Sequence, residues 1–487
     1  MGEISRLAAL VDTLSGARVL TVGDVMLDRY VSGQVDRISP EAPIPVLRVS
    51  GERAMLGGAG NVAANLAALG GGGPFVAAIG DDGAGSEIQR LLDRLQTITP
   101  SLATDAGRRT TQKTRFVGGA QQLIRADIES DAPLSGDALA EVLDLARAAV
   151  DKNPVVVLSD YGKGVLTSAV IEGVINAAHQ AGAFVIVDPK GHNYARYKGA
   201  DIVTPNKKEL HQATNMPVAT DEDVIIACEH LIASCELRGV LATRSAEGMT
   251  LVMKGEAPRH FKAEAREVFD VSGAGDTVVA TLALALAAGA NPYEAAHLAN
   301  IAAGIVVGKS GTATLSAEEL AHAVHHQEMN QAEAKLKGLE HAESITAKWR
   351  ERGLKVGFTN GCFDLLHPGH ISLLAQARSA CDRLVVGLNS DASVSRLKGP
   401  SRPVQSESAR AAVLGALAAV DMVVIFNEDT PIRLIETLRP DVLVKGADYS
   451  IETVVGADIV LGYGGRVVLA DLAEGHSTTN TIKRLKS

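Results

Sequence analysis

The stretch VFDVSGAGDTVVATLALALAAG, residues 268–289, decides how the first two-thirds of the chain is interpreted. Gly273 and Gly275 allow backbone N–H groups to turn toward an anion at the start of an apolar helix, where the helix dipole also favours negative charge. Asp276 follows at once, in a position to accept the proton of an attacking hydroxyl. The stretch predicts a phosphate-transfer site, and the alternative is an ordinary helix cap with an Asp in its first turn.

Short β-branched runs alternate with Ala/Leu-rich stretches on the N-terminal side of this segment. The runs are VLTVGD at 19–24, VVVLSD at 155–160, FVIVDP at 184–189 and DIVTPN at 201–206. This rhythm predicts βαβ units and a mostly parallel sheet, whose ligands gather at the carboxyl ends of the strands. Residues 30–49 alternate apolar and polar residues between prolines, which indicates edge strands forming a small lid.

A second α/β set follows a charged, helix-favouring stretch at 316–352. Its strand runs are LKVGFT, RLVVGLNS, MVVIFN, VLVKG and RVVLA. We therefore expect a domain at 1–325, a helical connector at 326–350 and a second domain at 351–487. The alternative for the connector is a last helix of the first domain running into the first helix of the second.

The composition indicates a globular enzyme that acts on small molecules. The 487 residues are 46% hydrophobic and 3% aromatic, and the net charge of -10 argues against a broad surface for nucleic acid. The longest apolar run, near 278–290, is too short for a bilayer, so we expect no membrane partner. The four cysteines form no CxxC pair, which fits a reducing compartment, and we expect a cytoplasmic protein.

The first set of motifs resembles ribokinase-type carbohydrate kinases over about residues 18–315. GGAGNVAANLAALG at 57–70 and DVSGAGDT resemble the two signatures of that family. The resemblance implies that Asp276 is the catalytic base and that Gly273, Ala274 and Gly275 form the anion hole. TPNKKEL at 204–210 resembles the family's Asn/Glu motif. It implies an ATP site, with Mg²⁺, at Asn206, Lys207, Lys208 and Glu209.

LATRSAEGM at 241–249 matches the strand and turn beside the nucleotide in that family, which implies roles for Thr243 and Gly248. Ser245 stands where a Gly is common. For the sugar, we expect Asp24 to bind hydroxyls and Gly57, Gly58 and Asn61 to approach them closely, with a turn cap as the alternative for Asp24. The available cations for a phosphorylated acceptor are Lys113, Arg115, Arg125 and Lys190, each of which has a solvated surface position as its alternative.

The most specific stretch is FTNGCFDLLHPGHISLLAQA at 358–377. His367 and His370 bracket Pro368-Gly369 as a helix begins, so their side chains converge on one phosphate. Zinc ligation is the alternative, but no Cys or His cluster lies nearby in the sequence, and we expect no fixed metal site. Imidazoles and helix N-terminal amides stabilise the charge that develops when a nucleoside triphosphate is attacked at its α-phosphate.

These residues resemble the HxGH nucleotidyltransferase superfamily over about 353–487, in a Rossmann-like domain. The resemblance implies that Thr359, Asn360, His367 and His370 bind the nucleotide phosphates. In a loop at 389–404, Lys398 and Arg402 would neutralise triphosphate charge, and a charged surface loop is the alternative. EGHSTTNTIKR at 474–484 resembles a phosphate-binding motif, which implies roles for Ser477, Thr478 and Thr479. Leu472 and Ala473 replace an Arg-Thr pair of the glycerol-phosphate cytidylyltransferases, which argues against their specificity.

The order of the two modules resembles the bifunctional heptose enzymes of Gram-negative lipopolysaccharide synthesis. The resemblance implies phosphorylation of D-glycero-β-D-manno-heptose 7-phosphate to the 1,7-bisphosphate. It also implies adenylyl transfer from ATP to heptose 1-phosphate, with Mg²⁺ in both steps. Lid strands of such kinases often pair across a dimer, so we expect a homodimer. Two alternatives stay open: a sugar kinase fused to a cytidylyltransferase of other substrate, and a non-catalytic nucleotide sensor.

Overall fold

The computed structural model describes residues 3–119, 121–263, 273–309, 313–447 and 449–471 of the chain. Its contacts divide the chain into two compact units, one comprising Arg6–Val324 and the other beginning at His325. Each unit has its own sheet and its own hydrophobic core. In the described part of the chain, no helix combines the length and the apolar character needed to cross a membrane.

The first unit is built on a nine-stranded sheet, in the order β13-β12-β11-β10-β9-β8-β1-β4-β5. The strands from β11 to β5 run parallel, and β12 and β13 are antiparallel additions at one edge. The bounds are β1 (Val19–Gly23), β4 (Gly73–Gly80), β5 (Ile98–Asp105), β8 (Val155–Ser159), β9 (Phe184–Asp188), β10 (Ile202–Val203), β11 (Gly239–Thr243), β12 (Met249–Met253) and β13 (Arg259–Phe261). The mostly parallel sheet expected from the β-branched runs is therefore confirmed.

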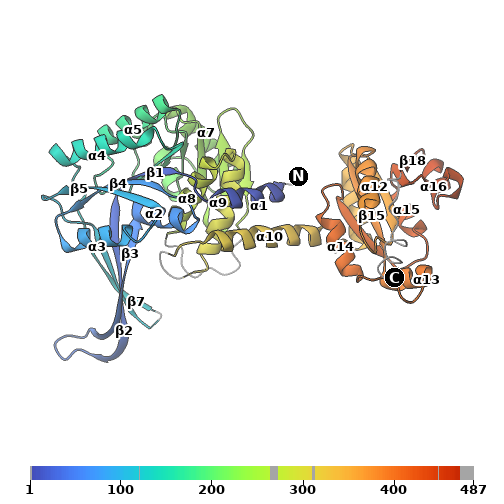
Figure 1. Ribbon diagram of the computed structural model, residues 1–487, viewed down its shortest axis with the longest axis horizontal. Helices are drawn as coiled ribbons and strands as arrows, with labels where there is room; N and C mark the ends of the chain where they lie inside the picture. The colour runs from blue at the N-terminus through green and yellow to red at the C-terminus, as the bar shows by residue number, and fades with distance from the viewer. Residues whose placement is uncertain (1–2, 120, 264–272, 310–312, 448, 472–487) are drawn as a thin grey trace. The chain divides into compact units, whose positions relative to one another are not determined.

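Helices cover both faces of this sheet (Figure 1). Alternate strand residues such as Leu20, Val22 and Val156 pack against α4, α5 and α7 on one face, as the period of two along a strand requires. Helices α2, α8 and α9 lie on the other face. The helices of the unit are α1 (Glu3–Thr13), α2 (Ala59–Ala68), α3 (Gly83–Leu92), α4 (Gly136–Val150), α5 (Ser168–Ala181), α6 (Lys207–Thr214), α7 (Asp221–Ser234), α8 (Ala274–Ala287) and α9 (Pro292–Val306).

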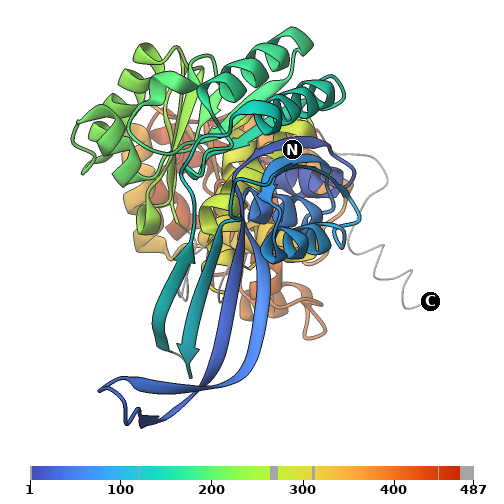
Figure 2. The same cartoon turned by 90° about the vertical axis from the view of Figure 1, so that its left-hand side faces the viewer.

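A separate four-stranded sheet forms the expected lid, in the order β3-β2-β6-β7. Its strands are β2 (Val25–Ile38), β3 (Pro45–Gly58), β6 (Gln112–Gly118) and β7 (Gln121–Ile128). Figure 2 shows these strands projecting away from the large sheet. Because β2 follows β1 after a single residue and β3 leads directly into α2, the base of the lid lies beside the carboxyl end of β1.

The second unit contains a five-stranded parallel sheet, in the order β16-β15-β14-β17-β18. Its strands are β14 (Val356–Gly361), β15 (Arg383–Asn389), β16 (Met422–Phe426), β17 (Val442–Gly446) and β18 (Arg466–Ala470). Its helices are α11 (Leu339–Glu351), α12 (Pro368–Ser379), α13 (Asp391–Lys398), α14 (Glu407–Ala416), α15 (Ile432–Leu438) and α16 (Ala457–Gly462). The strand runs predicted this second α/β set, and the arrangement is the Rossmann-like one that the resemblance to HxGH nucleotidyltransferases implied.

The charged stretch at 316–352 consists mostly of two helices. Helix α10 (Ala317–Ala334) crosses the division between the units, and α11 packs on α15, β14 and β16 of the second unit. The prediction of a loop at 389–404 was wrong in part, because 391–398 form α13. Ser390 caps that helix by accepting a hydrogen bond from the Ser393 N–H at 3.1 Å, so the local cap favours a helix there.

Candidate active sites

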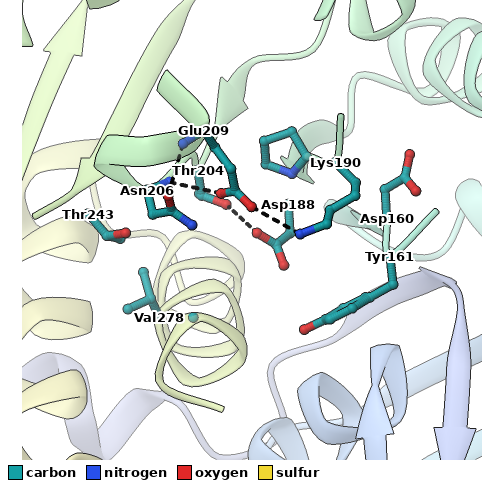
Figure 3. Close-up of a pocket in the computed structure, with 11 residues that line it drawn as sticks. Asp160, Tyr161, Asp188, Lys190, Thr204, Asn206, Glu209, Thr243 and Val278 are labelled. Atoms are coloured by element: carbon teal, nitrogen blue, oxygen red, sulfur yellow. Dashed lines mark hydrogen bonds and ion pairs between the residues drawn. The ribbon is translucent and has the colours of Figure 1, made fainter. Parts of the chain in front are cut away.

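A cavity of about 160 Å³ lies at the carboxyl ends of the parallel strands in the first unit (Figure 3). Strands β8, β9, β10 and β11 each supply residues from their carboxyl ends, and the first turns of α8 close the cavity from below. This is the edge at which open α/β sheets bind ligands. The lining residues are Asp160, Tyr161, Asp188, Pro189, Lys190, Thr204, Asn206, Glu209, Thr243, Gly275 and Val278.

Asp276 lies in the first turn of α8 and is 4% exposed. Its Oδ2 accepts a hydrogen bond from Asn61 Nδ2 at 2.7 Å, and its Oδ1 accepts one from the Tyr161 hydroxyl at 2.6 Å. Burial raises the pKa of Asp276 to about 6, against the opposing effect of the two hydrogen bonds. The side chain is therefore a buried carboxylate that is ionised at neutral pH and basic enough to accept a proton.

The start of α8 presents backbone amides beside this carboxylate. Gly273 caps the helix with a φ of +80°, a conformation that glycine adopts without strain. Gly275 lines the cavity, and a Cβ built there would meet no atom of the described residues within 4 Å. Three of the predicted residues, Gly273, Ala274 and Gly275, thus form the N-terminus of α8, and a helix N-terminus attracts anions.

Asn206 and Glu209 are brought together by a capping box at the start of α6. Asn206 Oδ1 accepts from the Glu209 N–H at 3.0 Å, and the Asn206 N–H donates to Glu209 Oε2 at 3.0 Å. The three-residue spacing follows from this reciprocal cap. Glu209 Oε1 also receives Lys190 Nζ at 3.3 Å, as Figure 3 shows. Burial raises the pKa of the neighbouring Asp188 carboxyl well above its usual range.

The remaining residues predicted to bind the nucleotide do not all line the cavity. Thr243 lines the same cavity, whereas Lys207 is paired with Glu247 at 3.1 Å and Lys208 is exposed. Gly248 has a φ of +88°, and a Cβ there would lie 1.9 Å from the Phe261 carbonyl oxygen. Glycine is therefore required by the turn between β11 and β12.

The base of the lid gathers several residues predicted for the sugar. Lys113 and Arg115 lie two residues apart on β6 and so share a face. Arg115 Nη1 donates to Asp28 Oδ1 at 2.7 Å, and the charge of Lys113 lowers the pKa of Asp276. A Cβ on Gly57 would lie 2.6 Å from Asp28 Oδ2, so this glycine makes room for the buried carboxylate. The sequence interpretation did not name Asp28, although it is an acidic residue within the apolar start of β2.

Three predicted sugar residues have other surroundings than expected. Lys190, two residues after the end of β9, lies with Glu209 in the cavity of Figure 3, because β9 adjoins β10. Arg125 is paired on the surface with Asp127 at 3.0 Å. Asp24 accepts backbone hydrogen bonds from Tyr161, Lys163 and Val165 at 2.9 to 3.0 Å. Those bonds are the turn-capping alternative, and a sugar contact of Asp24 stays a prediction.

The second unit places its predicted histidines at the start of α12. His367 is the residue before Pro368, the first of the helix, and its ring stacks on that of His370 with centroids 3.9 Å apart. Burial and the neighbouring His367 lower the pKa of His370 to about 4, so the imidazole is neutral at pH 7. Among the described residues, no group of three or more His, Cys, Asp and Glu side chains is arranged to hold a metal ion. The two rings therefore lie as a stacked pair at the start of α12.

Strand β14 ends beside these histidines. Among the described residues, Thr359 Oγ1 and Asn360 Oδ1 are buried and have no hydrogen-bond partner, which marks a place where a polar ligand would fit. Phe363 has a φ of +44°, so the NGCFD turn holds a non-glycine residue in the left-handed region. Such strain is typical of functional turns.

Asp364 orders the loop that follows α13. Its carboxylate is paired with Arg402 and accepts the Val404 N–H at 2.7 Å. Lys398 is exposed at the end of α13, and its charge acts on the Cys362 thiol in the NGCFD turn. Arg402 and Lys398 thus interact with residues of the NGCFD turn. Ser477, Thr478 and Thr479 lie outside the described residues.

Two further residues at this site were not found from the sequence. Arg410 is 1% exposed and donates to the carbonyl oxygens of Cys362 and Asn389 at 2.6 and 2.8 Å. Lys445 at the end of β17 donates to the Asn360 carbonyl oxygen at 3.0 Å. The KG pair that ends the VLVKG run was the only signal for Lys445. Nothing in a mid-helix position such as that of Arg410 distinguishes it from a solvent-exposed arginine.

Comparison with known proteins supplies a family for each unit. Residues 17–320 match the pfkB family of carbohydrate kinases, and residues 358–472 match a cytidylyltransferase-like family. The phosphofructokinase-2 of Escherichia coli in complex with substrates and products superposes with a TM-score of 0.55 at 22% identity. That likeness covers 63% of this chain and 99% of the other, and it concerns the fold.

The full-length relatives carry both units. The bifunctional protein HldE of Paramagnetospirillum magneticum is 59% identical over 485 residues, covering 100% of this chain and 99% of the relative. That of Rhodospirillum rubrum is 58% identical and covers 100% and 98%. The expected combination of a carbohydrate kinase with a nucleotidyltransferase is confirmed. The chain is an enzyme that belongs to the pfkB family of carbohydrate kinases and, over its full length, to the family of the bifunctional HldE proteins.

Proposed function

We propose that the two units catalyse two steps in making ADP-heptose for the lipopolysaccharide core. The first unit phosphorylates D-glycero-β-D-manno-heptose 7-phosphate at C1 with ATP, giving the 1,7-bisphosphate and ADP. The second joins AMP from ATP to heptose 1-phosphate, giving ADP-heptose and pyrophosphate. The observation that carries the proposal is the buried, hydrogen-bonded Asp276 at the start of α8, in a chain that matches two-module relatives from end to end.

In the kinase step, Asp276 takes the proton of the C1 hydroxyl as its oxygen attacks the γ-phosphorus and ADP leaves. The amides of Gly273, Ala274 and Gly275 stabilise the negative charge on the transferred phosphoryl group. Asn61 and Gly58 border the acceptor, since Asn61 bonds to Asp276 and Gly58 begins the turn into α2. Lys113 and Arg115 supply positive charge at the lid for the 7-phosphate, with Arg125 further out.

We propose that magnesium accompanies ATP at this site. The cavity fits a hydrated divalent cation bound to phosphates, because Glu209 and Asp188 place carboxyl groups on one wall and a bound cation would favour the ionised form of Asp188. Asn206, Lys190 and Thr243 line the same space and would contact the triphosphate. When bound, the ion neutralises charge on the phosphate oxygens.

In the transferase step, the oxygen of the sugar 1-phosphate attacks the α-phosphorus of ATP and pyrophosphate leaves. His367 and His370 stabilise the charge on the α-phosphate from the start of α12. Thr359 and Asn360 lie beside them with buried oxygen atoms. Lys398, Arg402 and the motif with Ser477, Thr478 and Thr479 are proposed to hold the remaining phosphates.

A homodimer that pairs through the lid is part of the proposal. The lid sheet exposes large apolar side chains, which water-facing strands usually avoid. The exposed side chains are Val35, Ile38, Ile44, Val49, Ile124 and Ile128. We expect Ile124→Glu to turn a dimer into a monomer in light scattering, with Ile226→Glu on α7 as an exposed control. A cytoplasmic site of action fits the four free cysteines and the ATP requirement.

Product analysis tests the proposal. The full-length protein with Mg-ATP is supplied with heptose 7-phosphate, heptose 1-phosphate, and a panel of pentose and hexose phosphates, and CTP is tried in place of ATP. Formation of heptose bisphosphate and ADP-heptose supports the proposal. Phosphorylation of another sugar, or a preference for CTP, would replace its substrates. An absence of turnover with every acceptor would favour a nucleotide sensor.

A further inference from the structure

Tyr161 is fixed directly beside the proposed base of the kinase. It follows β8 by two residues, and Figure 3 shows its ring pointing into the cavity. Its hydroxyl donates to Asp276 Oδ1 at 2.6 Å, and its own N–H donates to Asp24 Oδ2 at 2.9 Å. A Cβ on Gly58 would lie 3.4 Å from Tyr161 Cδ2, so the ring packs against the start of α2. The residue is thus held at its backbone amide and at its side-chain hydroxyl.

We propose that Tyr161 is a positioning residue of the kinase site, which holds the Asp276 carboxylate in one orientation by bonding to Oδ1 while Asn61 bonds to Oδ2. The inference rests on the proposed role of Asp276 as the base. The two donors come from separate elements, the loop after β8 and helix α2, and together they oppose rotation of the carboxylate. A second lone pair on each oxygen stays available for the sugar hydroxyl.

The tyrosine acts as a donor throughout the working pH range. Burial, and next the negative charge of Asp276, raise the pKa of Tyr161 well above its usual range. Its hydroxyl therefore stays protonated, and its hydrogen bond favours the ionised form of Asp276. Asp24 acts indirectly. Its carboxylate accepts hydrogen bonds from three backbone amides, and these bonds fix the conformation of the loop that carries Tyr161.

Other charged groups also face Asp276. Asp28 on β2 raises its pKa and Lys113 on β6 lowers it, and the Asp188 carboxyl at the end of β9 is close enough for mutual repulsion. A Tyr161→Phe change leaves all of these charges in place. A change in the pH profile of Y161F is therefore assigned to the lost hydroxyl.

The test is the pH profile of the kinase kcat/KM in the full-length protein, with Mg-ATP and the acceptor that wild type phosphorylates. For Y161F we expect the acidic limb to move to higher pH by about one unit. The lost hydrogen bond had favoured the ionised Asp276 carboxylate, and its loss raises the pKa of Asp276 by about one unit. Transferase activity should be unchanged. Tyr194→Phe is the matched control, because that hydroxyl is buried and has no hydrogen-bond partner in the described part of the chain. A Y161F profile that overlaps those of wild type and Y194F would overturn the inference.

Two further variants separate the possible failures. If D276N keeps the wild-type kinase rate, the proposed base is wrong. If D276N is inactive and the acidic limb of Y161F is unmoved, only the inference on Tyr161 fails. Should Y161F not fold, difluorotyrosine at position 161 preserves the shape with a more acidic hydroxyl. The limb should then move to lower pH, and an unmoved limb would overturn the inference.

Discussion

Replacing Arg410 with methionine should destabilise the second unit and abolish its activity. The guanidinium is fully buried and joins four segments of that unit. It donates to the carbonyl oxygens of Cys362, Asn389 and Gln405 at 2.6, 2.8 and 3.1 Å, and to Asp391 Oδ1 at 2.7 Å. Cys362 lies in the NGCFD turn and Asn389 at the end of β15. Gln405 lies before α14, and Asp391 begins α13.

The magnitude follows from the three carbonyl bonds. A hydrogen bond from a charged donor contributes about 1.5 kcal/mol, so the loss of three amounts to about 4.5 kcal/mol. The bond to Asp391 adds little, because that side chain is 43% exposed. For a domain of this size such a loss lowers the melting temperature by about 10 °C.

Tryptophan fluorescence isolates this effect. The chain contains one tryptophan, and Trp349 on α11 packs against the core of the second unit. Thermal unfolding followed at this residue should shift in R410M, while kinase activity of the first unit persists. Arg433→Met is the control, because that arginine is 70% exposed in its pair with Glu428. A shift in R410M no larger than in R433M would refute the reasoning.

Three further predictions concern the sites themselves. Because burial raises the pKa of Asp276 to about 6, kinase kcat/KM should be flat above pH 7 and fall about tenfold per unit below pH 5; a pH-independent rate would contradict this. The pKa of His370 is lowered to about 4, and the negative charge of a bound nucleotide should raise this pKa, so ATP binding should take up protons. Calorimetry in two buffers should show this proton uptake, and His370→Ala should abolish it. A Cβ at Gly57 would meet Asp28 Oδ2 at 2.6 Å, so Gly57→Ala should raise the acceptor KM roughly tenfold, whereas Gly83→Ala, where a Cβ meets nothing, should not.

Local patterns predicted the parts of the fold that local physics determines. The β-branched runs marked the buried parallel strands, because strands covered on both faces need apolar residues throughout. The resemblance of TPNKKEL to a family motif implied that Asn206 and Glu209 share a site, and their three-residue spacing is that of a reciprocal helix cap. Gly273 and Gly275 predicted the start of a helix, and Gly273 adopts there the positive φ that glycine allows without strain.

Contacts between distant segments could not be predicted in this way. Tyr161 and Asp276 are 115 residues apart, and Arg115 and Asp28 are 87 apart. Which cation lies near which carboxylate depends on strand order, which one sequence does not reveal. Lys190 shows this, because the pairing of β9 with β10 brings it to Glu209.

The central claim is that one chain carries two separate active sites, and it is tested most directly by measuring both products in two variants. We expect Asp276→Asn to lower heptose bisphosphate formation by about 10² to 10⁴ fold while ADP-heptose formation from heptose 1-phosphate stays at the wild-type rate. His370→Ala should have the opposite selectivity. Loss of both products in either folded variant, or of neither, would contradict the claim.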